Sequence, residues 1–210
     1  MKRFMGAAAL LLAAVFFSGL VGAGPTPVAA ASGDKPSGKG IVYLLRGGAN
    51  IFSTGMDEIA DKLDDRGVDA RSTGHASWPD VAREARERYE KKRQPIIIIG
   101  HSFGANAAIL AAEDLGKHNI PVALVVTFDP TAALQAPANV RWLVNFYSNT
   151  VQGMNLEVRP SAHFSGKLEN IAQSDVGHLE LDNDVRLHEQ TIGYILKLLG
   201  LPNRVTAASE

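Results

Sequence analysis

The sequence has no cysteine among its 210 residues. This absence excludes a disulfide, a thiolate metal site, a cysteine nucleophile and a lipid-modified cysteine at the N-terminus. Any chemistry that the chain performs must therefore use serine, histidine, acidic side chains and backbone amides.

The sequence also has no excess of charge of either sign. It contains 21 Lys and Arg residues and 22 Asp and Glu residues, which gives a formal net charge of −1. Binding to a nucleic-acid backbone or to an anionic membrane surface depends on an excess of basic residues, so we expect no nucleic-acid partner. With 46% hydrophobic and 20% charged residues, the composition is that of an ordinary globular protein.

The N-terminal stretch has its own pattern. Lys2 and Arg3 precede an uncharged segment that begins with an apolar run over 5–21 and ends in small residues near Ala31. These are the parts of a secretory signal, so we predict a signal peptide over 1–31 and a secreted or periplasmic protein without a membrane span after cleavage. The alternative is an uncleaved membrane anchor, since the run approaches the roughly 20 residues that a spanning helix needs.

After the predicted signal, a flexible lead-in over 32–40, one domain over 41–200 and a tail over 201–210 are expected. Apolar runs of strand length alternate with segments of helical periodicity, and the isoleucine run 96–99 has no polar alternation, so both of its faces should be covered. This order predicts a doubly wound α/β fold with a mostly parallel sheet of about five to six strands flanked by helices. The expected strands are 41–45, 68–71, 95–99, 122–128 and 140–147, and the expected helices are 55–66, 79–93, 105–115 and 185–199.

One segment breaks the alternation. Residues 148–177 are rich in Gly, Asn and Ser and show no clear period, and the segment is longer than a structural connection usually is. We expect it to be a functional loop that forms one wall of a substrate crevice.

The segment Gly100-His101-Ser102-Phe103-Gly104 follows the isoleucine run and opens an alanine-rich helix. Glycines at 100 and 104 allow a turn so tight that side chains there would collide, and such a turn lifts a serine hydroxyl above the edge of a sheet. We predict Ser102 as a nucleophile. The Phe103 backbone N–H, at the start of the helix, is the expected first donor to an oxyanion.

A serine hydroxyl needs a base and an acid that orients the base. Asp129 ends the next buried strand and is the predicted acid, because carboxyl ends of parallel strands meet at one edge of the sheet. His178, shortly before the last helix, is the predicted base. His163 competes with His178 because it shares the long segment, and Asp175 is the alternative acid.

The other histidines are weaker candidates: His75, His118 and His188 lie in connections or inside a helix, and the side chain of His101 is expected to point away from the site. Asp182 is predicted to cap the last helix.

A second oxyanion donor should come from the loop after the first strand. Gly47 and Gly48 lie there, and we predict the Gly48 N–H, with Thr54 and Asp57 as a capping box that fixes the following helix. A simple Gly-Gly turn explains the same residues.

These residues resemble the α/β-hydrolase family of serine esterases, lipases and thioesterases, in the elbow GHSFGA at 100–105 and in the order Ser102, Asp129, His178. The resemblance implies a minimal α/β-hydrolase fold without a cap domain. It also implies hydrolysis of a small-molecule ester or thioester through an acyl-enzyme, with no metal and no cofactor. The alternative is a non-catalytic envelope protein that binds a lipid or a partner in the same crevice. Acyl chain length, transfer to an acceptor other than water, and oligomeric state stay open.

Overall fold

The computed structural model describes residues 40–48, 53–151 and 153–203. The predicted signal peptide over 1–31, nearly all of the predicted lead-in and most of the predicted tail lie outside the described residues. Among the residues that are described, no helix combines the length and the apolar character needed to cross a membrane.

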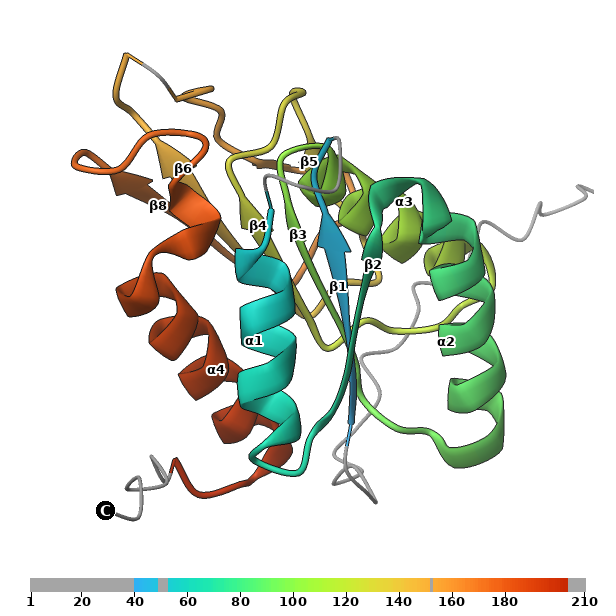
Figure 1. The fold of residues 1–210 in the computed structure, drawn as a ribbon. Coiled ribbons are helices and arrows are strands. Elements are labelled where there is room, and N and C mark those ends of the chain that lie inside the picture. Colours follow the sequence, from blue (N-terminus) through green and yellow to red (C-terminus); the bar gives the residue numbers. More distant parts are fainter. Residues whose placement is uncertain (1–39, 49–52, 152, 204–210) are drawn as a thin grey trace, which may run out of the picture. The chain divides into compact units, whose positions relative to one another are not determined.

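A six-stranded parallel sheet forms the centre of the domain, with the strand order β2-β1-β3-β4-β6-β8 (Figure 1). Every neighbouring pair in it runs parallel. A short second sheet pairs β5 with β7. The strands are β1 (Ile41–Arg46), β2 (Asp69–Gly74), β3 (Ile96–His101), β4 (Leu124–Phe128), β5 (Gln135–Ala136), β6 (Trp142–Ser148), β7 (Arg159–Pro160) and β8 (Lys167–Gln173).

Helices cover both faces of the six-stranded sheet, with α1 and α4 on one face and α2 and α3 on the other (Figure 1). The predicted doubly wound α/β architecture is therefore confirmed, and the helix boundaries differ from the predicted ones by a few residues. The helices are α1 (Gly55–Asp64), α2 (Trp78–Lys92), α3 (Phe103–Lys117) and α4 (Val185–Leu199), with 3₁₀ turns η1 (His75–Ser77) and η2 (Leu181–Asn183).

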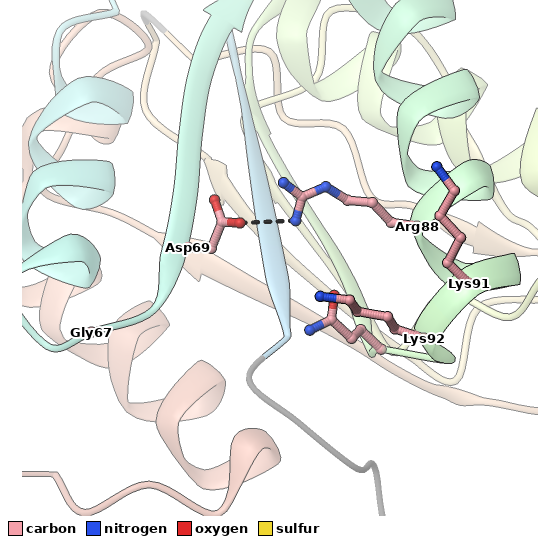
Figure 2. Close-up of a pocket in the computed structure, with 6 residues that line it drawn as sticks. Gly67, Asp69, Arg88, Lys91 and Lys92 are labelled. Carbon is pink, nitrogen blue, oxygen red and sulfur yellow. Dashed lines mark hydrogen bonds and ion pairs between the residues drawn. The ribbon is translucent and has the colours of Figure 1, made fainter.

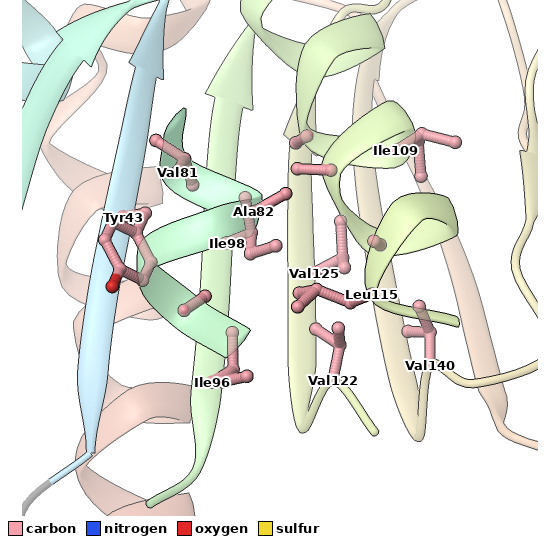
Figure 3. Close-up of a cluster of buried hydrophobic side chains, with 14 of the residues drawn as sticks. Tyr43, Val81, Ala82, Ile96, Ile98, Ile109, Leu115, Val122, Val125 and Val140 are labelled. Atoms are coloured by element: carbon pink, nitrogen blue, oxygen red, sulfur yellow. The ribbon is translucent and has the colours of Figure 1, made fainter. Parts of the chain in front are cut away.

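The core consists of two apolar layers that share the strands. Alternate side chains of β3 enter opposite layers, so that Ile96 and Ile98 pack with α2 and α3 (Figure 3) while Ile97 and Ile99 pack with α1 and α4. All four are at most 1% exposed. The prediction that both faces of the isoleucine run are covered is confirmed, and this double burial holds the end of β3 rigidly in place.

The prediction of a loop without regular structure over 148–177 was wrong, because this segment contains β7 and the edge strand β8. The sequence of β8 shows no apolar alternation, and its polar residue Asn170 forms hydrogen bonds with neighbouring segments. Asn170 exchanges hydrogen bonds of 2.9 Å with the backbone N–H and carbonyl of Val158 and accepts another from Asn145. Side-chain pairing of this kind leaves no period in the sequence.

The N-terminus of α4 also differs from expectation. Asp184, not Asp182, is the N-cap, and its carboxylate accepts a hydrogen bond of 2.8 Å from the Arg186 N–H. Asp182 is instead buried in η2.

Two helical glycines differ in the space around them. A Cβ on Gly104 would collide with the carbonyl oxygen of Leu45, because α3 begins against the end of β1, whereas a Cβ on Gly193 in α4 would meet nothing within 4 Å. We expect Gly104→Ala to lower the free energy of unfolding by about 1–3 kcal/mol or more.

The matched variant Gly193→Ala should raise it by about 0.5–1 kcal/mol, because alanine is the better helix former. Urea unfolding followed by circular dichroism measures both changes. Equal effects at the two positions would contradict the close approach at Gly104.

Candidate active site

Ser102 lies in the sharp turn between β3 and α3. Its backbone has φ 58° and ψ −122°, a left-handed conformation that costs a non-glycine residue energy, and its N–H donates to the Phe128 carbonyl at 2.9 Å. A Cβ on Gly100 would collide with the backbone of Gly104. Both glycines are thus needed for the tight turn between β3 and α3 in which Ser102 lies.

Asp129 leaves the sheet beside Ser102. The parallel register pairs His101 with Phe128, so the next residue of each strand emerges at the same carboxyl edge. The Asp129 carboxylate is fully buried and accepts hydrogen bonds of 3.1 Å from the N–H groups of Ser148 and Met154. The end of β6 and the loop that follows it therefore fix the orientation of this carboxylate.

His178 lies in the connection between β8 and η2 and joins the two side chains. Its Nδ1 is 2.8 Å from Asp129 Oδ2 and its Nε2 is 3.1 Å from Ser102 Oγ. Because a carboxylate only accepts, Nδ1 donates to Asp129 and the Nε2 lone pair faces the serine hydroxyl. The imidazole side chain is 14% exposed. In this arrangement, His178 can take the hydroxyl proton as Ser102 attacks.

The alternative residues lie outside this arrangement. His163 is exposed in the turn between β7 and β8, and Asp175 is an exposed ion-pair partner of Arg186, at 3.1 Å.

The loop after β1 is held by several contacts. The Gly47 N–H donates to Ser53 Oγ at 2.9 Å, and the Gly47 carbonyl accepts from His75 Nδ1 at 3.2 Å. The predicted capping box was wrong: Thr54 forms no side-chain cap, and Asp57 pairs with Arg46 at 3.0 Å. That ion pair joins the end of β1 to the first turn of α1.

Gly48 lies beside the residue after the nucleophile. A Cβ on Gly48 would lie 3.1 Å from the Phe103 ring, so the two residues predicted as oxyanion donors are adjacent. Phe103 is the first residue of α3, and its N–H therefore has no helical carbonyl one turn before it. The Gly47 N–H already donates to Ser53, which leaves Gly48 as the glycine whose amide is suited to this role. Residues 49–52 of the same loop are outside the described residues.

The sequence did not predict a buried polar cluster of Ser53, His101 and Asp182, which contacts the His178 backbone. His101 Nδ1 is 2.8 Å from Ser53 Oγ and 3.4 Å from Asp182 Oδ1, and His101 Nε2 is 2.9 Å from the His178 carbonyl oxygen. The expectation that His101 points away from the site was therefore wrong. No spacing rule reveals this cluster, because its members lie far apart in the sequence: Ser53 before α1, His101 at the end of β3 and Asp182 in η2. The one available signal is the polar character of His101 at the end of an otherwise apolar strand.

Burial shifts both titratable groups of the cluster toward their neutral forms. It lowers the pKa of His101 from 6.5 to about 4 and raises the pKa of Asp182 from 3.8 to about 7, the latter against backbone hydrogen bonds that favour the carboxylate. Charges on His178 and Glu58 have smaller effects on Asp182.

The residues that follow the serine and the histidine in the sequence have exposed apolar side chains. Phe103 follows the nucleophile and is 52% exposed, and Leu179 follows the base and is 57% exposed. Exposed apolar groups beside reactive groups are suited to contact an apolar part of a ligand.

Two hollows lie elsewhere. One, of about 450 Å³, is at the amino ends of the strands, opposite the serine, where Arg88 pairs with Asp69 near Lys91 and Lys92 (Figure 2). The other, of about 530 Å³, is formed by the loops after β4 and β6 and includes Tyr147 and Arg159. Ser102, Asp129 and His178 line neither of them.

The pKa shifts predict opposite stability profiles for two variants. In the folded protein Asp182 stays protonated up to about pH 7, whereas in the unfolded chain it loses its proton near pH 3.8. The contribution of Asp182 to the free energy of unfolding is therefore present at pH 4 and is lost by about pH 7. The variant Asp182→Asn has no carboxyl group at this position, so it does not undergo this loss of stability as the pH rises. The free energy of unfolding, relative to the parent, should therefore rise between pH 4 and 7 by up to about 1.4 kcal/mol per pH unit.

His101→Asn is the matched comparison. The lowered pKa of His101 makes its contribution grow from about pH 4 to 6.5, so this variant should lose stability relative to the parent over that range. Denaturant unfolding at half-unit pH steps measures both profiles. Parallel profiles for the parent and both variants would contradict the assigned shifts.

Comparison with known proteins finds similar folds among solved structures but no match by sequence. No protein-family model matches the sequence, and no curated protein matches it. Among solved structures, an esterase from Pyrobaculum calidifontis matches with a TM-score of 0.54 and 12% identity, over 79% of this chain and 78% of that chain. Est1E from Butyrivibrio proteoclasticus matches with a TM-score of 0.53 and 12% identity, over 79% of this chain and 90% of that chain.

A structure reported for LipS and LipT, two metagenome-derived lipolytic enzymes, matches with a TM-score of 0.51 and 14% identity, over 76% of this chain and 95% of that chain. At these identities the likeness concerns the fold. Together with the parallel sheet and its flanking helices, it shows that the chain has the α/β-hydrolase fold.

Proposed function

We propose that the chain is an exported serine hydrolase that cleaves a carboxylic ester or a thioester through Ser102, His178 and Asp129. One observation carries the proposal: a single imidazole bonds to the serine hydroxyl on one side and to a buried carboxylate on the other. Export rests on the basic, apolar and small-residue pattern of residues 1–31. The esterase and lipolytic activities named for the similar structures favour ester substrates.

In the proposed reaction, Ser102 Oγ bonds to the substrate carbonyl carbon while His178 Nε2 takes the hydroxyl proton. The tetrahedral intermediate collapses as the bond to the leaving oxygen or sulfur breaks, and His178 returns the proton to the departing alcohol or thiol. Water then attacks the acyl-enzyme and gives its proton to His178. The bond between the acyl carbon and Ser102 Oγ then breaks, His178 returns the proton to Oγ, and the carboxylic acid is released. Asp129 holds the imidazole orientation and stabilises its transient positive charge.

The negative charge of the tetrahedral intermediate needs donors that are already in place. We assign this role to the backbone N–H groups of Phe103 and Gly48. The Phe103 amide is at the positive end of the α3 dipole, and Gly48 lies so close to Phe103 that a Cβ on Gly48 would be 3.1 Å from its ring. The contacts that fix Gly47 hold the second donor without reorganisation during the reaction.

The first test is covalent labelling of the serine. A fluorophosphonate probe should label the parent protein at Ser102, and Ser102→Ala should take up no probe while keeping its fold. Ser165→Ala, at an exposed serine between β7 and β8, is the matched control and should label like the parent. Mass spectrometry of the labelled peptide identifies the site. A folded parent protein that takes up no probe would support a non-catalytic binding protein instead.

The exposed apolar side chains predict a preference for apolar acyl groups. Replacing the half-exposed Leu179 in Leu179→Ser should raise KM for esters with longer acyl chains by up to about tenfold, because part of a leucine's burial energy is lost, and should leave acetyl esters unchanged. Leu110→Ser, at an exposed leucine about two turns along α3 from Ser102, is the control. An equal KM change for all chain lengths would refute this assignment. Steady-state kinetics with a graded ester panel measures it.

A further inference from the structure

The cluster of Ser53, His101 and Asp182 has the residue types of a second catalytic set but cannot act as one. Ser53 and His101 are each 1% exposed and Asp182 is fully buried, so a substrate has no access to them. The cluster lies instead between two segments that the proposed reaction needs. Its serine bonds to the loop of Gly47, and its histidine bonds to the backbone of His178.

The direction of each hydrogen bond follows from what each atom can do. The His178 carbonyl only accepts, so His101 Nε2 carries a proton and donates at 2.9 Å. In a neutral imidazole, Nδ1 is then an acceptor, and the Ser53 hydroxyl donates to it at 2.8 Å. The oxygen of that hydroxyl accepts from the Gly47 N–H at 2.9 Å. One continuous chain of hydrogen bonds therefore runs from the loop after β1 to the backbone of the proposed base.

We propose that His101 is a positioning residue, which holds the His178 backbone and the Gly47–Gly48 loop in a fixed relation around Ser102. This inference rests on the proposed hydrolase function. In this role His101, the residue before the nucleophile, keeps the base and the oxyanion donors at fixed positions relative to each other during proton transfer.

The surroundings of His101 suit this task. Its ring lies against the ring of His178, with centroids 5.1 Å apart, so a sideways shift of either ring is opposed by packing as well as by the hydrogen bond. Burial keeps the imidazole neutral, with its pKa lowered to about 4, which preserves Nδ1 as an acceptor.

The charged and titratable groups facing the cluster come from several elements. Asp182 in η2 is 3.4 Å from His101 Nδ1, and Glu58 in α1 and His178 influence Asp182 through charge. His188 in α4 bonds to the Asp182 carbonyl. Because burial favours the protonated form of Asp182, the Nδ1 lone pair faces a neutral group over most of the acid range.

Two substitutions separate the ends of the hydrogen-bond chain. In His101→Gln, the side-chain amide nitrogen takes the place of Nε2 and keeps the donor to the His178 carbonyl. In His101→Asn, the shorter side chain keeps an acceptor near Ser53 but leaves the His178 carbonyl without its donor. We expect His101→Asn to lower kcat by about 10- to 100-fold, with KM changed less than about twofold, because small misplacements of a reacting group have effects of this size.

The glutamine variant should recover most of this loss, with kcat within about threefold of the parent and a similar recovery in the rate of fluorophosphonate labelling. Circular dichroism and urea unfolding of both variants ensure that the comparison is made between folded proteins. Ser53→Ala, which frees Gly47 but keeps the bond to His178, should also lower kcat at unchanged KM.

The outcomes are distinguishable. If the folded parent takes up no probe, the proposed function fails. If the parent labels and both His101 variants label at the parent rate, or if glutamine and asparagine slow labelling equally, the function stands and the positioning role of the donor to His178 is overturned. Slow labelling by the asparagine variant with recovery by glutamine supports the inference.

Discussion

The buried carboxylate of Asp129 is the group on which the arrangement of the site depends. A carboxylate without water must be surrounded by donors, and here they come from the end of β6, from the following loop and from the imidazole of His178. Each donor belongs to a different part of the chain, so satisfying one buried charge also orders the segments around the serine. Turning the imidazole would remove one of the three donors to that carboxylate, and this restraint directs Nε2 toward the Ser102 hydroxyl.

Packing of the sheet supplies the second constraint. Because β1, β3 and β4 are neighbours in parallel register, the loops that follow them open at one edge, and the helices on both faces keep these strand ends from moving. The left-handed backbone of Ser102 is unfavourable by itself, and it is held by the hydrogen bond to the Phe128 carbonyl and by the close packing at Gly100 and Gly104. The packing of the core therefore holds the proposed nucleophile, Ser102, in a fixed position.

The fold alone would be compatible with many activities, and the similar solved structures share little sequence with this chain. What points to a hydrolase is the geometry around Ser102: the distances from His178, the glycines of the tight turn after β3 and the exposed apolar residues Phe103 and Leu179. The cluster around His101 adds a physical link between two loops that catalysis would use together. It also explains why a polar residue ends an otherwise apolar strand.

Periodicity and residue order predicted the alternating strands and helices, because doubly buried strands and amphipathic helices leave local patterns. They also indicated Ser102, Asp129 and His178 as candidates, through the elbow motif and the order along the chain. The polar strand β8, the burial of Asp182 and the inward direction of His101 were decided only by tertiary structure. These features depend on hydrogen bonds between residues far apart in the chain, such as Asn170 with Val158 and His101 with Ser53, and no local pattern encodes a partner that folding brings from elsewhere.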